Sequence, residues 1–244
     1  MADKTGIEWT DATWNPVTGC TAISAGCDHC YAETLSLRLQ RMGVEKYRQG
    51  FEVVLHPAAL TQPLRWKSPR RVFVNSMSDL FHARVPKDYV LQIWEVMRQC
   101  PQHTFQVLTK RPERMARFTA DYPAPDNVWL GSSVEDMRVM QRIDRLRECA
   151  APVRFLSCEP LIGPLPGLDL SGIHWVIVGG ESGAHHRPID ADWVRDIQKQ
   201  CGKAGVPFFF KQWGGLTPKS RGRLLDGRFW DEFPLPAPTL SAAS

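Results

Sequence analysis

From about residue 50 onward, one pattern of hydrophobic and polar positions repeats along the chain. A short apolar run rich in β-branched and aromatic residues is followed by a polar loop and then by an amphipathic stretch. The runs lie at residues 51–55, 72–75, 105–108, 128–130, 153–156, 175–178 and 206–210. Because they are almost continuously apolar, they are typical of strands covered on both faces of a parallel sheet.

The stretches between the runs predict helices. Residues 88–100 and residues 134–149 each place apolar side chains on one face, and a further helix is expected to start near Tyr31. With a first strand at residues 7–9 or 13–17, the chain has seven or eight β/α units. This number favours a complete or partial (β/α) TIM-type barrel with parallel strands over an open doubly wound sheet.

Composition and termini agree with one folded domain. The 244 residues are 43% hydrophobic and 23% charged, which excludes a disordered chain, collagen and a coiled coil. We expect residues 1–215 to form a single β/α-barrel domain and residues 216–244 to be an extension with a flexible end. The polar start of the chain and the lack of a long apolar run predict a cytoplasmic protein with no membrane partner. A net charge of +4 leaves nucleic acid open as a partner.

Polar residues follow nearly every predicted strand, at the edge where parallel β/α folds carry their reacting groups. Helix capping explains serine and aspartate at these positions, Ser132 among them. Capping does not explain Lys110 or Lys211, because a cation at a helix start opposes the helix dipole. These lysines therefore indicate an anionic ligand or a buried carboxylate partner, with a rim ion pair as the ordinary alternative.

The most specific local feature is a loop with three cysteines, Cys20, Cys27 and Cys30, in the spacing C-x6-C-x2-C. Thiolates are soft ligands, so in a reducing compartment this loop predicts a metal or redox site. Zinc would need a fourth ligand such as His29 or water. An iron–sulfur cluster held by three cysteines would keep one iron open for an outside ligand.

Further motifs accompany the cysteine loop: IEWTD at 7–11, WNP at 14–16, VNSMSDLFH at 74–82, LTKRP at 108–112, GSSVE at 131–135, SCEP at 157–160, GGESG at 179–183 and FKQWG at 210–214. Over about residues 5–215 the chain resembles a phage-associated family of three-cysteine proteins. The three-cysteine loop before a helix, within a β/α barrel, also resembles the radical S-adenosylmethionine (radical SAM) superfamily, although the first cysteine gap is usually three residues there.

The resemblance implies that Cys20, Cys27 and Cys30 hold a 4Fe-4S cluster whose open iron binds S-adenosylmethionine. An external electron donor would reduce the cluster, and cleavage of the cofactor would lead to hydrogen abstraction from an unknown substrate, with a nucleotide or DNA as a candidate. The polar strand ends supply the candidate cofactor contacts, which are Asn75, Ser76, Ser78, Ser132, Gly179, Gly180 and Glu181. The candidate catalytic residues are Lys110, Glu159 and Lys211.

Two other functions stay open. A zinc-stabilised nucleic-acid-binding protein would use the cysteine loop together with the basic segment 219–223. A barrel hydrolase would use strand-end carboxylates, with Glu135, Glu159 and Glu181 as candidates, but it leaves the cysteine loop unexplained.

Overall fold

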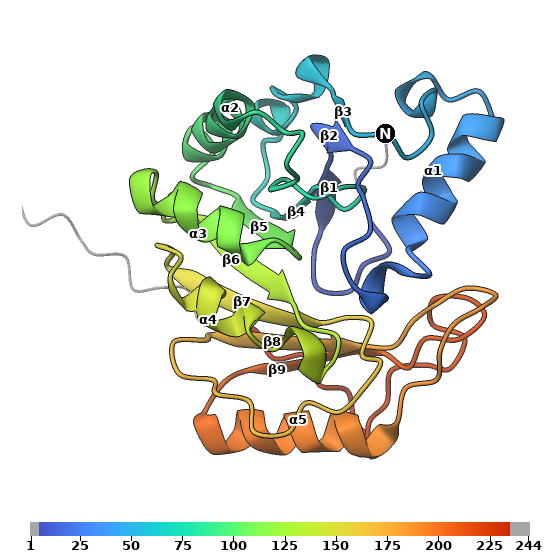
Figure 1. Ribbon diagram of the computed structural model, residues 1–244. Helices are drawn as coiled ribbons and strands as arrows, with labels where there is room; N and C mark the ends of the chain where they lie inside the picture. The colour runs from blue at the N-terminus through green and yellow to red at the C-terminus, as the bar shows by residue number, and fades with distance from the viewer. Residues whose placement is uncertain (1–4, 235–244) are drawn as a thin grey trace, which may run out of the picture.

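Parallel strands form a curved sheet in the computed structural model, which describes residues 5–234 (Figure 1). Within these residues the sheet has seven strands, in the order β1 (Ala12–Trp14), β4 (Arg71–Val74), β5 (Thr104–Thr109), β6 (Val128–Ser133), β7 (Val153–Cys158), β8 (Trp175–Gly179) and β9 (Phe208–Gln212). The edge strands β1 and β9 do not pair with each other in this part of the chain, so the barrel is open. The prediction of a parallel (β/α) barrel is confirmed in its partial form.

Five α-helices follow or precede these strands in the described residues: α1 (Tyr31–Arg41), α2 (Lys87–Arg98), α3 (Pro112–Asp121), α4 (Arg142–Arg147) and α5 (Ala191–Ala204). Local signals set their ends. Pro112 starts α3, where its missing N–H costs nothing. The Asp190 side chain caps α5, and Gly205 ends it in the left-handed conformation. Helices α2 to α5 lie along the outer side of the sheet, whereas α1 stands apart beside the loop that precedes it (Figure 1).

The two faces of the sheet bury different sets of side chains, because successive residues of a strand point to opposite faces. On the outer face, Val74, Val107 and Leu130 belong to the large core shared with the helices. On the inner face, a smaller aromatic cluster fills the base of the half-barrel; it consists of Trp9, Phe73, Phe155, Trp175, Ile177 and Phe209. Trp9 comes from the segment before β1, so residues 7–9 fill the base of the half-barrel and do not form the first strand.

The prediction that residues 51–55 form a strand of the parallel sheet was wrong. Only Val54–Leu55 is a strand there (β3), and it pairs antiparallel with β2 (Val17–Thr18) in a separate two-stranded sheet. The physical reason lies in the preceding residues. The carbonyl oxygen of Phe51 accepts a hydrogen bond from the backbone N–H of Cys20 at 3.2 Å, so this segment supports the cysteine loop.

The single helix predicted for residues 134–149 was also wrong. Val134 continues alongside β7, where its N–H donates to the carbonyl oxygen of Ser157 at 3.0 Å. A short 3-10 helix (Met137–Val139) and α4 follow. The buried carboxylate of Glu135 faces inward, which is incompatible with a helix that exposes its polar residues.

Part of the chain beyond residue 215 packs on the sheet. The Trp175 indole donates to the carbonyl oxygen of Glu232 at 2.8 Å, and the Trp175 and Phe233 rings lie 5.0 Å apart. Phe208 N–H also donates to the Glu232 carboxylate at 2.9 Å. The predicted flexible end, residues 235–244, lies outside the described residues.

We predict that Gly131→Ala destabilises the half-barrel. A Cβ at Gly131 would overlap the ring of Phe155, which is fully buried on the inner face. Overpacking at such a position costs about 1–3 kcal/mol of unfolding free energy. Urea denaturation measures the loss. Gly202→Ala is the control, because its nearest neighbour would lie 3.9 Å away and alanine favours the helix. Equal stability of the two variants would contradict the packing described for Gly131.

Candidate functional site

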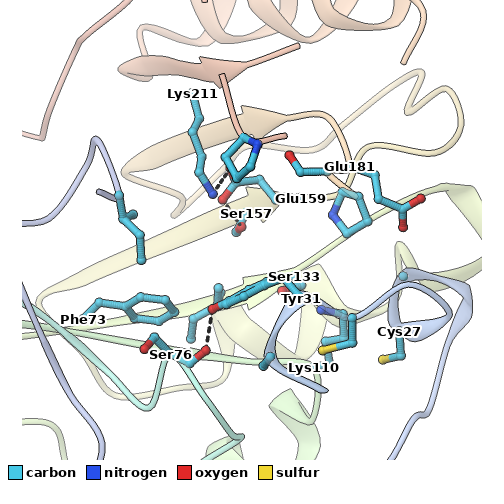
Figure 2. Close-up of a pocket in the computed structure, with 18 of the residues that line it drawn as sticks. Cys27, Tyr31, Phe73, Ser76, Lys110, Ser133, Ser157, Glu159, Glu181 and Lys211 are labelled. Carbon is cyan, nitrogen blue, oxygen red and sulfur yellow. Dashed lines mark hydrogen bonds and ion pairs between the residues drawn. The ribbon is translucent and has the colours of Figure 1, made fainter. Parts of the chain in front are cut away.

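A cavity of about 500 Å³ lies at the carboxyl ends of the parallel strands (Figure 2). The three cysteines of the loop all contribute to its wall. Figure 2 shows Cys27 on one side of the cavity and Phe73 on the opposite side, with the Lys211–Glu159 pair facing Tyr31 and Ser76 across it. The cavity therefore joins a group of thiols to a polar wall and an aromatic wall.

Most residues singled out from the sequence meet at this cavity. Those that line it are Cys20, Cys27, Cys30, Asn75, Ser76, Ser78, Lys110, Glu159, Gly180, Glu181 and Lys211. Ser132 and Gly179 do not line it. The parallel sheet explains this convergence, because residues far apart in sequence follow neighbouring strands that all end at one edge.

The position of Ser132 follows from strand alternation. Its side chain is fully buried, and Ser133 is the β6 serine that lines the cavity. A shift of one residue along a strand moves a side chain to the other face.

Gly180 was expected to give a ligand close access to the backbone, but a Cβ there would overlap the carbonyl oxygen of Trp213. The close approach at Gly180 is therefore within the protein.

The first cysteine is held by a buried carboxylate and an arginine. Asp79 accepts a hydrogen bond from Arg111 Nη1 at 2.9 Å, and its other oxygen accepts one from Thr109 Oγ1 at 2.7 Å. Arg111 Nη1 also lies 3.5 Å from Cys20 Sγ, and Nη2 donates to the carbonyl oxygen of Thr21 at 2.9 Å. The Asp79–Arg111 pair thus links the ends of β4 and β5 to the start of the cysteine loop.

The surroundings of Cys20 also influence its thiol. Burial raises the pKa of Cys20, the charge of Asp79 adds to this effect, and Arg111 opposes it; the net pKa is raised. Gly19 determines the backbone conformation directly before Cys20. It has φ +82°, and a Cβ there would overlap the carbonyl oxygen of Glu52, so only glycine fits.

A second carboxylate–arginine pair holds the far part of the loop. Arg187 donates from Nε to Glu181 Oε2 at 3.0 Å and from Nη2 to Oε1 at 2.6 Å. The same Nη2 donates to the carbonyl oxygen of Ala25 at 2.8 Å, and Nη1 lies 3.3 Å from Asp28 Oδ2. Burial acts to raise the pKa of Glu181, but the hydrogen bonds and charge of Arg187 outweigh it and lower the pKa. Glu181 is therefore an ionised partner of Arg187.

A third pair lies behind the middle of the loop. Arg142 Nη1 donates to Glu135 Oε2 at 2.8 Å and to the carbonyl oxygen of Ser133 at 3.0 Å. The other oxygen, Glu135 Oε1, accepts a hydrogen bond from the backbone N–H of Gly26 at 3.4 Å. Gly26 sits in the 3-10 helix Ala25–Cys27, so Glu135 supports the turn that presents Cys27.

The polar wall of the cavity is built around Glu159. Lys211 Nζ lies 3.2 Å from Glu159 Oε1, and Ser157 Oγ donates to Oε2 at 3.1 Å (Figure 2). A Cβ at Gly179 would lie 2.6 Å from Glu159 Oε1, so the glycine makes room for this carboxylate. Gly179 was expected to approach a ligand, and the structure places it against Glu159.

All three carboxylates considered for a barrel hydrolase have cationic partners; they are Glu135, Glu159 and Glu181. Hydrolysis by paired carboxylates needs one group as acid and another as base or nucleophile, both facing the substrate. Glu135 and Glu181 instead use both of their oxygens within the protein. The site offers no support for this function.

Free hydrogen-bonding groups remain near the thiols. In the described part of the chain, no ion pair or hydrogen bond engages the Lys110 ammonium group, although its backbone N–H donates to Asp79. The buried Asn75 side chain accepts from Val17 N–H, and its Nδ2 has no partner among these residues. Ser78 Oγ, by contrast, donates to the carbonyl oxygen of Val17 at 3.0 Å. Lys110 and Asn75 are therefore the groups most available to a ligand.

The cavity has an aromatic side as well. Tyr31, the first residue of α1, lines it and donates its hydroxyl to the carbonyl oxygen of Ser76 (Figure 2). Trp9 and Phe73 also line it, from the base of the half-barrel. Apolar rings on one side and charged groups on the other suit a ligand with a planar part and an ionic part.

The donor set fits a cofactor held by thiolates. Cys20, Cys27 and Cys30 lie on one loop and line one cavity, so a group bound to them would face the open space. The other cysteines are buried away from it; they are Cys100, Cys149, Cys158 and Cys201. In residues 5–234 no three side chains of Cys, His, Asp or Glu are already grouped as a metal site. The same residues include no helix with the length and hydropathy of a membrane span.

Several site residues escaped the sequence analysis. Arg111, Arg142 and Arg187 were not singled out, and Asp79 came only under the general explanation of strand-end aspartates by helix capping. Arginine motifs were visible in LTKRP and near the GGESG segment, but an arginine that follows a strand has no distinctive spacing relative to its carboxylate partner. Only the folded chain brings these pairs to the cysteine loop.

Comparison with known families gives one match over nearly the whole chain. A family model described as a protein of unknown function (DUF5131) matches residues 4–234. Among curated proteins, none matches the sequence.

Solved structures of spore photoproduct lyase are similar to this chain at low sequence identity. The complex with dinucleoside spore photoproduct is 13% identical, with a TM-score of 0.42, and the match covers 77% of this chain and 59% of that chain. A cysteine-to-serine mutant is 12% identical, with a TM-score of 0.45 and coverage of 83% and 65%. A mutant with bound AdoMet and the dinucleoside is 12% identical, with a TM-score of 0.40 and coverage of 78% and 61%. The match to the first of these thus spans about three fifths of the lyase chain.

We predict that Gly26→Ala weakens the folded state. The new Cβ would lie 2.8 Å from Glu135 Cδ, and the Glu135 side chain cannot withdraw without leaving Arg142. The unfolding free energy should fall by about 1–3 kcal/mol in denaturant titrations. Ala22→Ser, at an exposed position of the same loop, should leave it unchanged. A Gly26→Ala protein as stable as the Ala22→Ser protein would rule out a close fit of the loop on Glu135.

Proposed function

This chain belongs to the DUF5131 family of proteins of unknown function, and we propose that it is an iron–sulfur enzyme of the radical SAM type. One observation supports this most: three cysteines of a single loop line one cavity at the mouth of a partial β/α barrel. In this proposal Cys20, Cys27 and Cys30 hold a 4Fe-4S cluster, and the iron without a cysteine ligand is open to S-adenosylmethionine.

When bound and reduced by an external electron donor, the cluster supplies the electron for reductive cleavage of S-adenosylmethionine and hydrogen abstraction from a substrate. The chain supplies the binding contacts. The Lys110 ammonium, which pairs with no group in residues 5–234, is suited to the cofactor carboxylate. The unpartnered Asn75 Nδ2 is suited to an acceptor oxygen of the same ligand, which would remove the cost of a buried donor without a partner.

The Lys211–Glu159 pair has a second role in this proposal. Ser157 and Lys211 occupy the two oxygens of Glu159, which fixes the carboxylate toward the cavity. A fixed carboxylate orients a hydroxyl group of a ligand, and the lysine beside it holds a proton for a group that becomes anionic. Glu159 and Lys211 are thus the proposed residues for ribose or substrate contacts.

In this proposal the aromatic rings of the cavity reduce the access of water to a bound ligand. Trp9 and Phe73 form its base, and Tyr31 is fixed by its hydrogen bond to Ser76. A reactive species that can abstract hydrogen requires such exclusion, because side reactions with solvent end the cycle. We propose residues 1–215 as the catalytic domain and a nucleotide or DNA as the first substrate class to test.

Metal content of anaerobically purified protein tests the proposal. We expect about four irons and about four sulfides per chain, and an absorption spectrum that changes on addition of S-adenosylmethionine. Cys27→Ala should lose most of the iron, because two thiolates remain, whereas Cys201→Ala should keep it, because Cys201 is buried on α5. One tightly bound zinc ion and no response to the cofactor would refute the proposal.

Removal of the Lys110 charge tests the cofactor site. Lys110→Met keeps the length of the side chain but not its charge, and we expect about tenfold weaker binding of S-adenosylmethionine to the iron-loaded protein. Iron content should not change, because Lys110 is not a thiol ligand. Lys203→Met, at an exposed position near the end of α5, is the control. Calorimetric titration that gives the same affinity for both variants would exclude Lys110 from the site.

A further inference from the structure

The cysteine loop depends on other parts of the chain for its shape. Between Cys20 and Cys30 the regular structure is limited to the 3-10 helix Ala25–Cys27. Residues without regular hydrogen bonding keep one shape only where contacts from elsewhere in the chain hold them. Besides the backbone of Phe51, side chains from the ends of β4, β5, β6 and β8 hold this loop.

Two arginines reach the loop directly. Arg111 contacts Cys20 Sγ and the carbonyl oxygen of Thr21, and Arg187 contacts the carbonyl oxygen of Ala25 and the carboxylate of Asp28. One arginine therefore holds the loop just after its first cysteine, and the other holds it on both sides of its second.

Each arginine is itself held by a carboxylate. The Asp79 and Glu181 side chains are 8% and 4% exposed, and their arginine partners are 15% and 27% exposed. Such burial separates these pairs from surface ion pairs, which contribute little to stability. The planar guanidinium can serve a carboxylate and a backbone carbonyl at the same time, which a lysine ammonium does less well.

We propose that Arg111 and Arg187 are positioning residues that set the cysteine loop in its ligand-binding shape before any cofactor is present. The proposal rests on the proposed function only in taking the three cysteines as the ligands. It gives Asp79 and Glu181 a role in orienting the arginines. Glu181, expected from the sequence to contact the cofactor, acts through Arg187 on the loop.

Hydrogen exchange of the full chain, measured by mass spectrometry with metal removed, tests the proposal. In Arg187→Gln we expect the amides of residues 24–28 to exchange about tenfold faster than in the natural sequence, because charge-assisted hydrogen bonds are lost. In Arg111→Gln the same change is expected near residues 20–22. Amides of β4 should keep their rates in both variants.

Conservative variants and a matched control separate positioning from general loss of stability. Arg187→Lys and Arg111→Lys keep the charge and should restore part of the protection. Arg195→Gln is the control, because Arg195 also pairs with two carboxylates, Asp192 and Asp226, but on the outer helix α5. In Arg195→Gln the amides of the cysteine loop should exchange at the same rates as in the natural sequence. On reconstitution, both loop variants should take up less iron than the control.

Natural exchange rates in the loop of both glutamine variants would overturn the proposal, as would equal acceleration in Arg195→Gln. The proposed function fails separately, if the natural protein binds no iron. In that case the exchange measurement still decides whether the two arginines hold the loop, because it uses protein without metal.

Discussion

Buried carboxylates with arginine partners connect the strand ends to the cysteine loop, and the site depends on them. Three such pairs, Asp79–Arg111, Glu135–Arg142 and Glu181–Arg187, reach the loop from different strands. A buried charge is costly unless it is paired and hydrogen-bonded, so removal of one partner leaves a large penalty on the other. The same requirement decides where the remaining hydrogen bonds of each pair go. The carboxylate oxygens accept further hydrogen bonds from neighbouring groups of the chain, and two of the arginines, Arg111 and Arg187, donate further hydrogen bonds to the loop.

This arrangement divides the polar groups around the cysteine loop and the cavity into two sets. Asp79, Glu135 and Glu181 serve the loop and have little capacity left for a ligand. Lys110, Asn75 and the Lys211–Glu159 pair line the cavity, and among the described residues the Lys110 ammonium and Asn75 Nδ2 have no partner. Both sets come from the same edge of the sheet, because parallel strands bring their carboxyl ends together. The partial barrel thus supports the loop and the ligand site with adjacent residues.

Elements with a strong local pattern were predicted correctly, whereas elements whose place depends on competition between two segments were not. Strands β4 to β9 were predicted from apolar runs, and α2 from its amphipathic face. Residues 51–55 carry the same kind of run, but they support Cys20 and join a separate sheet. Ser132 was chosen over Ser133, because the face that a strand residue occupies depends on register, which a short apolar run does not define.

By itself, the sequence determined a parallel β/α fold, a loop with three closely spaced thiols and the set of polar residues that follow the strands. These features depend on the order of residues within a few turns or one strand, so the local sequence predicts them without knowledge of the tertiary structure. Only the tertiary structure decided which of the polar residues hold the loop and which keep groups available for a ligand. Glu181 and Glu159 both follow strands and have the same side chain, yet Glu181 pairs with Arg187 and Glu159 pairs with Lys211. That difference arises from contacts between segments far apart in the chain, and no local pattern carries it.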